Sequence, residues 1–242
     1  MYKNVFLIGI LVLLCACDKH DPILPGERSA IFDTTNIQLL NTSVPNLSET
    51  IHVTETHDCQ YRLDRENTIW DGERKIFSGF ATGNSVDGER SAFCNGNFVY
   101  AGLTTGELIK VNPKNRQIMW IADIYRTSNM TGGASVLDIV APIVFDKTYI
   151  YVGGLGKAFC KLLDTNGKKI WCIDLGVEKP FIVTSETAFV LDTDKKLSAV
   201  RLKDGAIYWQ TTTKDSSTPK YENKTIFVGR EKFNAETGEK IK

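Results

Sequence analysis

The sequence has no excess of charge of either sign. Its 242 residues include 29 basic and 29 acidic side chains, so the formal net charge is zero. Proteins that bind nucleic acid usually carry a basic excess, and disordered chains are usually highly charged and poor in apolar residues. Hydrophobic residues make up 42% of the chain, as in an ordinary globular protein. The balance therefore argues against a nucleic-acid partner and against long disorder.

Long apolar runs and cysteines are also scarce. The apolar run near the N-terminus extends from Val5 to Leu14 and is broken only by Gly9. About ten residues are too few to cross roughly 30 Å of hydrocarbon as a helix. Six cysteines in 242 residues are too few for a small disulfide scaffold. The sequence is therefore not that of a multi-pass membrane protein or a cysteine-rich module.

The N-terminus instead has the pattern of a secretory signal. Lys3 precedes the short apolar run, which ends in Leu14-Cys15-Ala16-Cys17. One interpretation is an ordinary signal peptide. The favoured one is a lipoprotein signal, because the four residues resemble a lipobox with Cys17 as the acylated first mature residue. Several acyl chains hold a protein stably on a bilayer. Asp18 resembles the inner-membrane retention signal of some bacteria, so the sequence does not decide between the inner and the outer membrane.

The chain divides into four parts. We expect a signal peptide over 1–16, and a lipidated tether over 17–32, where Pro22, Pro25 and Gly26 discourage regular structure. Residues 33–73 form a poorly defined segment. Residues 74–242 carry internal repeats, described next.

Three tryptophans mark the repeats. Each of Trp120, Trp171 and Trp209 ends a stretch of alternating strands and polar turns. Such strands joined by short turns predict antiparallel meanders, and a period near 40 residues is typical of propeller blades. The predicted fold is all-β, a propeller of about four four-stranded blades. We expect the tryptophans to pack between neighbouring sheets.

The two ends of the repeat region suggest ring closure. A fourth repeat begins at Asn223, and its spacing places the next tryptophan beyond residue 242, so we expect this blade to lack its outer strand. Residues 74–80 contain Phe77 in the place of a tryptophan. Pairing this strand with the last blade would remove two exposed edges. The alternative is an incomplete ring that needs a partner or a second copy.

The repeats resemble those of quinoprotein-type propellers. The residues that carry the resemblance are Leu162-Leu163-Asp164 with Gly167 and Trp171, and more loosely Val200 to Trp209. Together with the lipobox, the chain resembles the BamB family of lipoproteins of the outer-membrane β-barrel assembly machinery, whose propeller has eight blades. The resemblance implies a scaffold that docks to the barrel-assembly protein (BamA-like) from the periplasmic side of the outer membrane.

Catalytic patterns are missing. Quinone-dependent enzymes with this repeat have an adjacent cysteine pair and an acidic calcium site, and neither occurs here. His20, His52 and His57 precede the repeats, and His52 with His57-Asp58-Cys59 is a weak metal pattern. We expect no enzyme activity, catalytic residue, metal, cofactor or small-molecule substrate. A quinoprotein-like enzyme, and a degenerate propeller that binds another envelope protein, stay as alternatives.

Cys160 and Cys172 lie on the two strands of one hairpin, centred near Asn166. This places them opposite each other, as Ile109 and Ile121 are placed in the first repeat. Two interpretations stay open: a disulfide, which a periplasmic location permits, or two small apolar residues in an isoleucine site. The partner-binding residues are unknown, and the candidate contact loops are 126–138 and 176–180.

Overall fold

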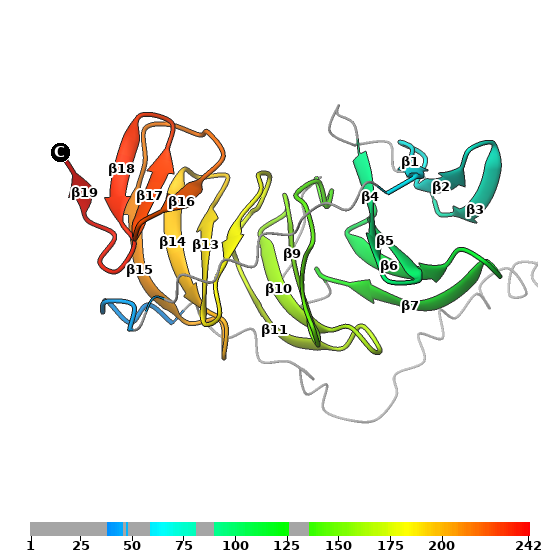
Figure 1. Cartoon of the computed structure of the whole chain (residues 1–242), viewed down its shortest axis with the longest axis horizontal. Helices are drawn as coiled ribbons and strands as arrows, with labels where there is room; N and C mark the ends of the chain where they lie inside the picture. Colours follow the sequence, from blue (N-terminus) through cyan, green and yellow to red (C-terminus); the bar gives the residue numbers. More distant parts are fainter. Residues whose placement is uncertain (1–37, 46, 48–58, 81–89, 126–135) are drawn as a thin grey trace, which may run out of the picture. The chain divides into compact units, whose positions relative to one another are not determined.

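The computed structural model describes residues 38–45, 47, 59–80, 90–125 and 136–242. These residues form strands and no helix, so the all-β prediction is confirmed (Figure 1). The strands are β1 (Tyr61–Leu63), β2 (Thr68–Asp71), β3 (Arg74–Ser78), β4 (Arg90–Asn95), β5 (Phe98–Gly102), β6 (Glu107–Asn112), β7 (Gln117–Asp123), β8 (Val144–Asp146), β9 (Tyr149–Gly154), β10 (Ala158–Leu163), β11 (Lys169–Ile173), β12 (Ile182–Val183), β13 (Thr187–Leu191), β14 (Lys196–Arg201), β15 (Ile207–Thr212), β16 (Lys220–Glu222), β17 (Thr225–Val228), β18 (Glu231–Asn234) and β19 (Lys240–Ile241).

Four antiparallel meanders of four strands each repeat along the chain. They are β4–β7, β8–β11, β12–β15 and β16–β19, here called blades 1 to 4. Each strand pairs with the next one in sequence, because the connections are short turns that reverse the chain. The prediction of four four-stranded blades is confirmed.

The predicted closing strand pairs elsewhere. β3 pairs with β2, and β1 pairs with β4, so blade 1 continues into a seven-stranded sheet of order β3-β2-β1-β4-β5-β6-β7. Blade 4 has its own fourth strand, β19, paired with β18. Among the described residues no strand pairs β1–β3 with blade 4. The expected closure by residues 74–80 is therefore wrong.

The physical reason lies in a tight turn between β2 and β3. Asp71 faces Arg74, so only Gly72 and Glu73 form the loop. Gly72 has a φ of 58°, which glycine adopts without steric cost. A hairpin closed by two residues costs far less chain entropy than pairing with a strand some 160 residues away.

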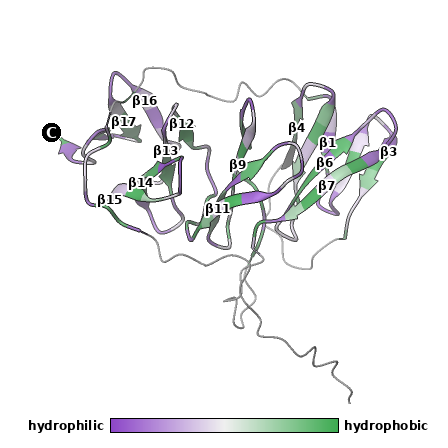
Figure 2. Ribbon diagram, turned by 90° about the horizontal axis from the view of Figure 1, so that it is seen from below, coloured by the Kyte–Doolittle hydropathy of each residue, from purple (hydrophilic) through white to green (hydrophobic). Residues whose placement is uncertain are grey.

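Apolar side chains form a series of clusters along the chain. One lies between the N-terminal strands and blade 1, and three more lie between successive blades. Middle strands such as β9 and β13 are buried along most or all of their length, because neighbouring sheets cover both of their faces. This accounts for their nearly continuous apolar sequence (Figure 2).

Residues 38–45, here called the strap, lie along the outer strand of blade 3. Leu39 forms a parallel bridge with Ile207 of β15, and the Leu40 N–H donates to the Ile207 carbonyl oxygen at 2.8 Å. The strap then reaches blade 4, where the N–H of the buried Val44 donates to the Glu236 carbonyl oxygen. The segment before residue 74 thus contains both the strap and two strands, β1 and β2.

Candidate functional site

The three tryptophans hold equivalent places in the outer strands of blades 1 to 3. In each hairpin the tryptophan faces a residue of the preceding strand, and the register shifts directly beside that pair. The facing residues are Lys110, Lys161 and Ala199. Phe77 holds the same place in β3, facing Ile69 beside a shift of the same kind. The four aromatic residues therefore share one register position.

Each indole joins its blade to the next one. The Nε1–H donates to a backbone carbonyl oxygen of the following blade: Trp120 to Asp164 at 2.8 Å, Trp171 to Leu202 at 3.1 Å, and Trp209 to Ala235 at 3.2 Å. The ring also lies on a glycine of that blade with positive φ. These glycines are Gly167, Gly205 and Gly238, where an added Cβ would come within 2.7, 3.0 and 2.4 Å of the ring. We call each pair of tryptophan and glycine a seam.

The junction between β1–β3 and blade 1 is built differently, because Phe77 has no N–H to donate. The Asn67 side chain replaces it: Nδ2 donates to Thr104 Oγ1 at 2.7 Å, and the Thr104 N–H donates to Asn67 Oδ1 at 2.9 Å. A disulfide between Cys59 and Cys94, with Cα atoms 5.4 Å apart, spans the same junction. No local pattern in the sequence places these two cysteines opposite each other.

A partly buried ion pair lies beside the Trp120 seam. Lys110 Nζ is 2.9 Å from Asp164 Oδ1, and the Tyr100 hydroxyl donates to the same oxygen at 2.6 Å. Burial, and then the bond to Asp164, raises the pKa of Tyr100, so its hydroxyl stays a donor. Because lysine, carboxylate and phenol bind one another, we interpret the cluster as holding blades 1 and 2 together.

Lys161 has the same place in blade 2 as Lys110 in blade 1, but it meets no carboxylate in the seam. Its Nζ donates to the Leu202 carbonyl oxygen at 2.9 Å and lies 3.9 Å from the centre of the Tyr149 ring. Burial lowers the pKa of Lys161, and the nearby Asp146 opposes that shift. A carbonyl and an aromatic face thus replace the carboxylate.

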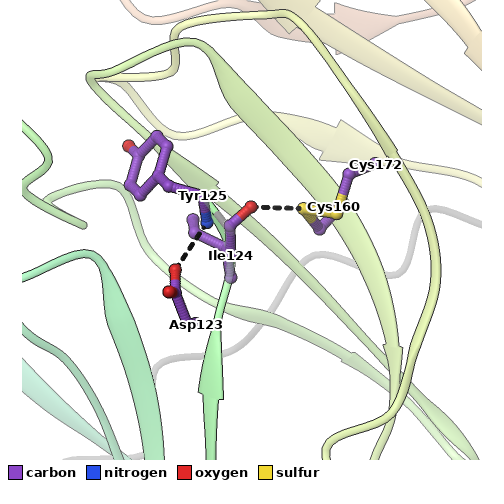
Figure 3. Close-up of a disulfide and its surroundings, with 5 residues drawn as sticks. All are labelled: Asp123, Ile124, Tyr125, Cys160 and Cys172. Atoms are coloured by element: carbon purple, nitrogen blue, oxygen red, sulfur yellow. Dashed lines mark hydrogen bonds between the residues drawn. A yellow bond between two sulfur atoms is a disulfide. The ribbon is translucent and has the colours of Figure 1, made fainter. Parts of the chain in front are cut away.

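Cys160 and Cys172 face each other in the β10–β11 hairpin, with Cα atoms 4.1 Å apart, and are joined by a disulfide (Figure 3). Cys160 Sγ lies 3.7 Å from the Ile124 carbonyl oxygen. A disulfide sulfur carries no hydrogen, so this is a packing contact against blade 1. Of the two interpretations of this pair, the structure therefore has the bridge.

The candidate contact loops differ in what the structure says of them. Cys17 and residues 126–135 lie outside the described residues. The connection 176–180 is partly buried: the Val177 N–H donates to the Gly154 carbonyl oxygen, and its side chain is fully covered. Glu178 and Pro180 are exposed. Only this outer part of the connection is accessible for a partner.

The described part of the chain has no group of three or more His, Cys, Asp or Glu residues placed to hold a metal ion. His52 and His57 lie outside it, and Cys59 is occupied by its disulfide. None of the described residues forms a helix long and apolar enough to span a bilayer.

Comparisons with known proteins agree with the repeat architecture. A family model described as outer membrane protein assembly factor BamB matches residues 67–211. A curated protein of that name from Kangiella koreensis is 22% identical over 126 residues, which cover 52% of this chain and 32% of the relative. This chain thus matches about a third of that protein's length.

A solved structure shares this fold. The crystal structure of BamB from Moraxella catarrhalis matches with a TM-score of 0.51 and 16% identity, over 82% of this chain and 66% of the other. A quinohemoprotein alcohol dehydrogenase from Comamonas testosteroni gives a TM-score of 0.42 and 14% identity, over 55% of this chain and 22% of the enzyme.

Proposed function

Because the chain belongs to the family of the outer membrane protein assembly factor BamB, we propose that it is a non-catalytic scaffold in outer-membrane protein assembly. In this proposal it binds the barrel-assembly protein and assists the insertion of outer-membrane proteins. The observation that carries the proposal is the family match over more than half of the chain, on a fold of stacked four-stranded blades. Exposed strands and turns on a rigid scaffold are suited to protein binding.

The proposed location is the periplasmic side of the outer membrane, with lipid on Cys17. The support is the sequence Leu14-Cys15-Ala16-Cys17 after a short apolar run. Metabolic labelling with a palmitate analogue should mark the wild-type protein and leave Cys17→Ala unlabelled. Fractionation of the membranes then shows whether the labelled protein lies in the outer membrane, as proposed, or in the inner membrane, which Asp18 would favour. Labelling of the alanine variant would contradict lipidation at Cys17.

Co-purification tests the binding role. The full chain, extracted from membranes with mild detergent, should retain the barrel-assembly protein of the same organism. Addition of pyrroloquinoline quinone and calcium should leave the melting temperature unchanged. Purification without the barrel-assembly protein would refute the proposed partner, and a rise in melting temperature with the quinone would favour an enzyme.

A further inference from the structure

Eight strands stand at the ends of the described sheets. Five of them are the last strands of their meanders, β3, β7, β11, β15 and β19, and the other three, β8, β12 and β16, are the first strands of theirs. A terminal strand has one row of backbone groups without a sheet partner, and natural proteins commonly protect such edges with lysine, arginine or proline. Three of the five follow this rule, with Arg74 and Lys75 on β3, Lys169 on β11 and Lys240 on β19. β15 has no charged residue, and β7 has none before its last residue, Asp123.

β15 is protected in another way, because the strap covers it. The Ile207 N–H donates to the Gln38 carbonyl oxygen at 2.9 Å, and the Thr42 N–H donates to the Tyr208 carbonyl oxygen at 3.0 Å. Ile207 is fully buried in the cluster between blades 2 and 3, and Tyr208, in the cluster that includes Val44 of the strap, is only 5% exposed. An extended chain in parallel pairing is thus what covers an uncharged outer strand in this protein.

β7 has a similar sequence, uncharged before Asp123, and no segment that the structure describes pairs with its outer edge. Ile118 and Met119 directly precede Trp120, just as Ile207 and Tyr208 directly precede Trp209. The side chains of Ile118 and Met119 are each 44% exposed. Ile121, also on β7, is 48% exposed. Within the described residues β7 pairs with β6 alone. Apolar side chains gathered on an unpaired, uncharged edge are typical of an interaction surface.

We propose that the free edge of β7 is a docking strand for an extended segment of a partner protein, which pairs with it as the strap pairs with β15. The segment has apolar residues at alternate positions and no charge opposite Ile118 to Ala122, since that part of β7 offers no counter-charge. Main-chain hydrogen bonds hold such an added strand, and its side chains give selectivity. The inference rests on the proposed scaffold function and names its contact surface.

A matched pair of substitutions isolates the edge. Met119→Lys adds the protective charge that β7 lacks. Ile170→Lys makes the same change at the corresponding place in β11, one residue before Trp171, where the side chain is also 44% exposed. Both side chains point out of the core, so both variants should keep the melting temperature and circular dichroism of the wild type.

The first measurement uses a fluorescent peptide with the sequence of residues 37–45, which contains the strap. Fluorescence anisotropy should show saturable binding to the full wild-type chain and to Ile170→Lys. Binding to Met119→Lys should be at least about tenfold weaker, because a lysine replaces a central apolar contact. Absence of binding to the wild type, or equal binding to all three proteins, would overturn the proposal.

The second measurement uses the purified periplasmic part of the barrel-assembly protein. Loss of its binding in Met119→Lys alone supports the β7 edge as its contact, whereas equal binding by all three proteins refutes that contact and leaves the scaffold function standing. If even the wild type fails to bind, the scaffold function falls and the peptide result alone decides on the edge. A wild-type dimer in sedimentation that Met119→Lys dissociates would make the occupant a second copy and contradict the proposed partner.

Discussion

Replacement of Gly167 by alanine tests whether the tryptophan seams join the blades. Gly167 has a φ of 69°, and an added Cβ would lie 2.7 Å from Cε3 and 2.8 Å from Cδ2 of Trp120. The left-handed backbone costs about 1–2 kcal/mol for a residue with a Cβ. The overlap with the buried indole adds about 1–3 kcal/mol. We therefore expect Gly167→Ala to lower the free energy of unfolding by about 2–5 kcal/mol.

Gly96 supplies the matched control. It has a φ of 59°, and no atom lies within 4 Å of an added Cβ. Gly96→Ala should therefore show only the backbone cost of about 1–2 kcal/mol. The difference between the two alanine variants measures the packing of the indole on its glycine.

A double-mutant cycle separates the two costs at Gly167 itself. Trp120→Ala removes the ring and should cost about 3–5 kcal/mol. Without the ring, Gly167→Ala should cost no more than the backbone cost, so the two changes should be coupled by about 1–3 kcal/mol. Urea unfolding monitored by circular dichroism gives all four free energies. Additive losses in the cycle, or equal losses for Gly167→Ala and Gly96→Ala, would refute the seam.

Three further predictions address other parts of the structure. The Cys160–Cys172 bridge closes a loop with a sequence separation of 12. Replacing both residues by alanine should therefore lower the free energy of unfolding by about 3 kcal/mol. Mass spectrometry that finds both thiols alkylated in unreduced protein would contradict the bridge. Burial raises the pKa of Tyr151 from its ordinary value of 10.0. Above that pH the unfolded chain therefore binds fewer protons than the folded chain, and the free energy of unfolding falls as pH rises. Tyr151→Phe should make this fall shallower in urea titrations at about pH 9 and about pH 11, and an unchanged slope would disprove the assignment. In the strap, Val44→Ala should lower the free energy of unfolding by about 2 kcal/mol, because Val44 is only 4% exposed. Leu39→Ala should lower it less, because Leu39 is 47% exposed. Equal losses in calorimetry would mean that the strap does not pack as described.

The repeat itself could be predicted from the sequence because its signals are local. Alternating strands, short turns and the spacing of Trp120, Trp171 and Trp209 lie within single meanders, where neighbours in sequence are also neighbours in space. The opposition of Cys160 and Cys172 follows from the same hairpin geometry. Phe77 has the tryptophan register that the sequence predicts, but its strand pairs with β2 and not with the last blade.

That error shows where the sequence signal ends. The Asp71-Gly72 turn favours the local β2–β3 hairpin over pairing with the last blade. No tryptophan marks β19, and the prediction that the last blade lacks its outer strand is wrong. A count of blades does not specify which edges meet, because edge pairing depends on the positions of whole sheets.

The sequence by itself therefore determined the all-β class, the four blades and the aromatic register, since short-range periodicity encodes all three. The tertiary structure alone decided the contacts between distant segments. It joined Cys59 to Cys94, placed Lys110 against Asp164, and laid the strap on β15, whereas no described segment pairs with the outer edge of β7. Each of these contacts joins residues that are distant in the sequence, and no local sequence pattern specifies such a contact.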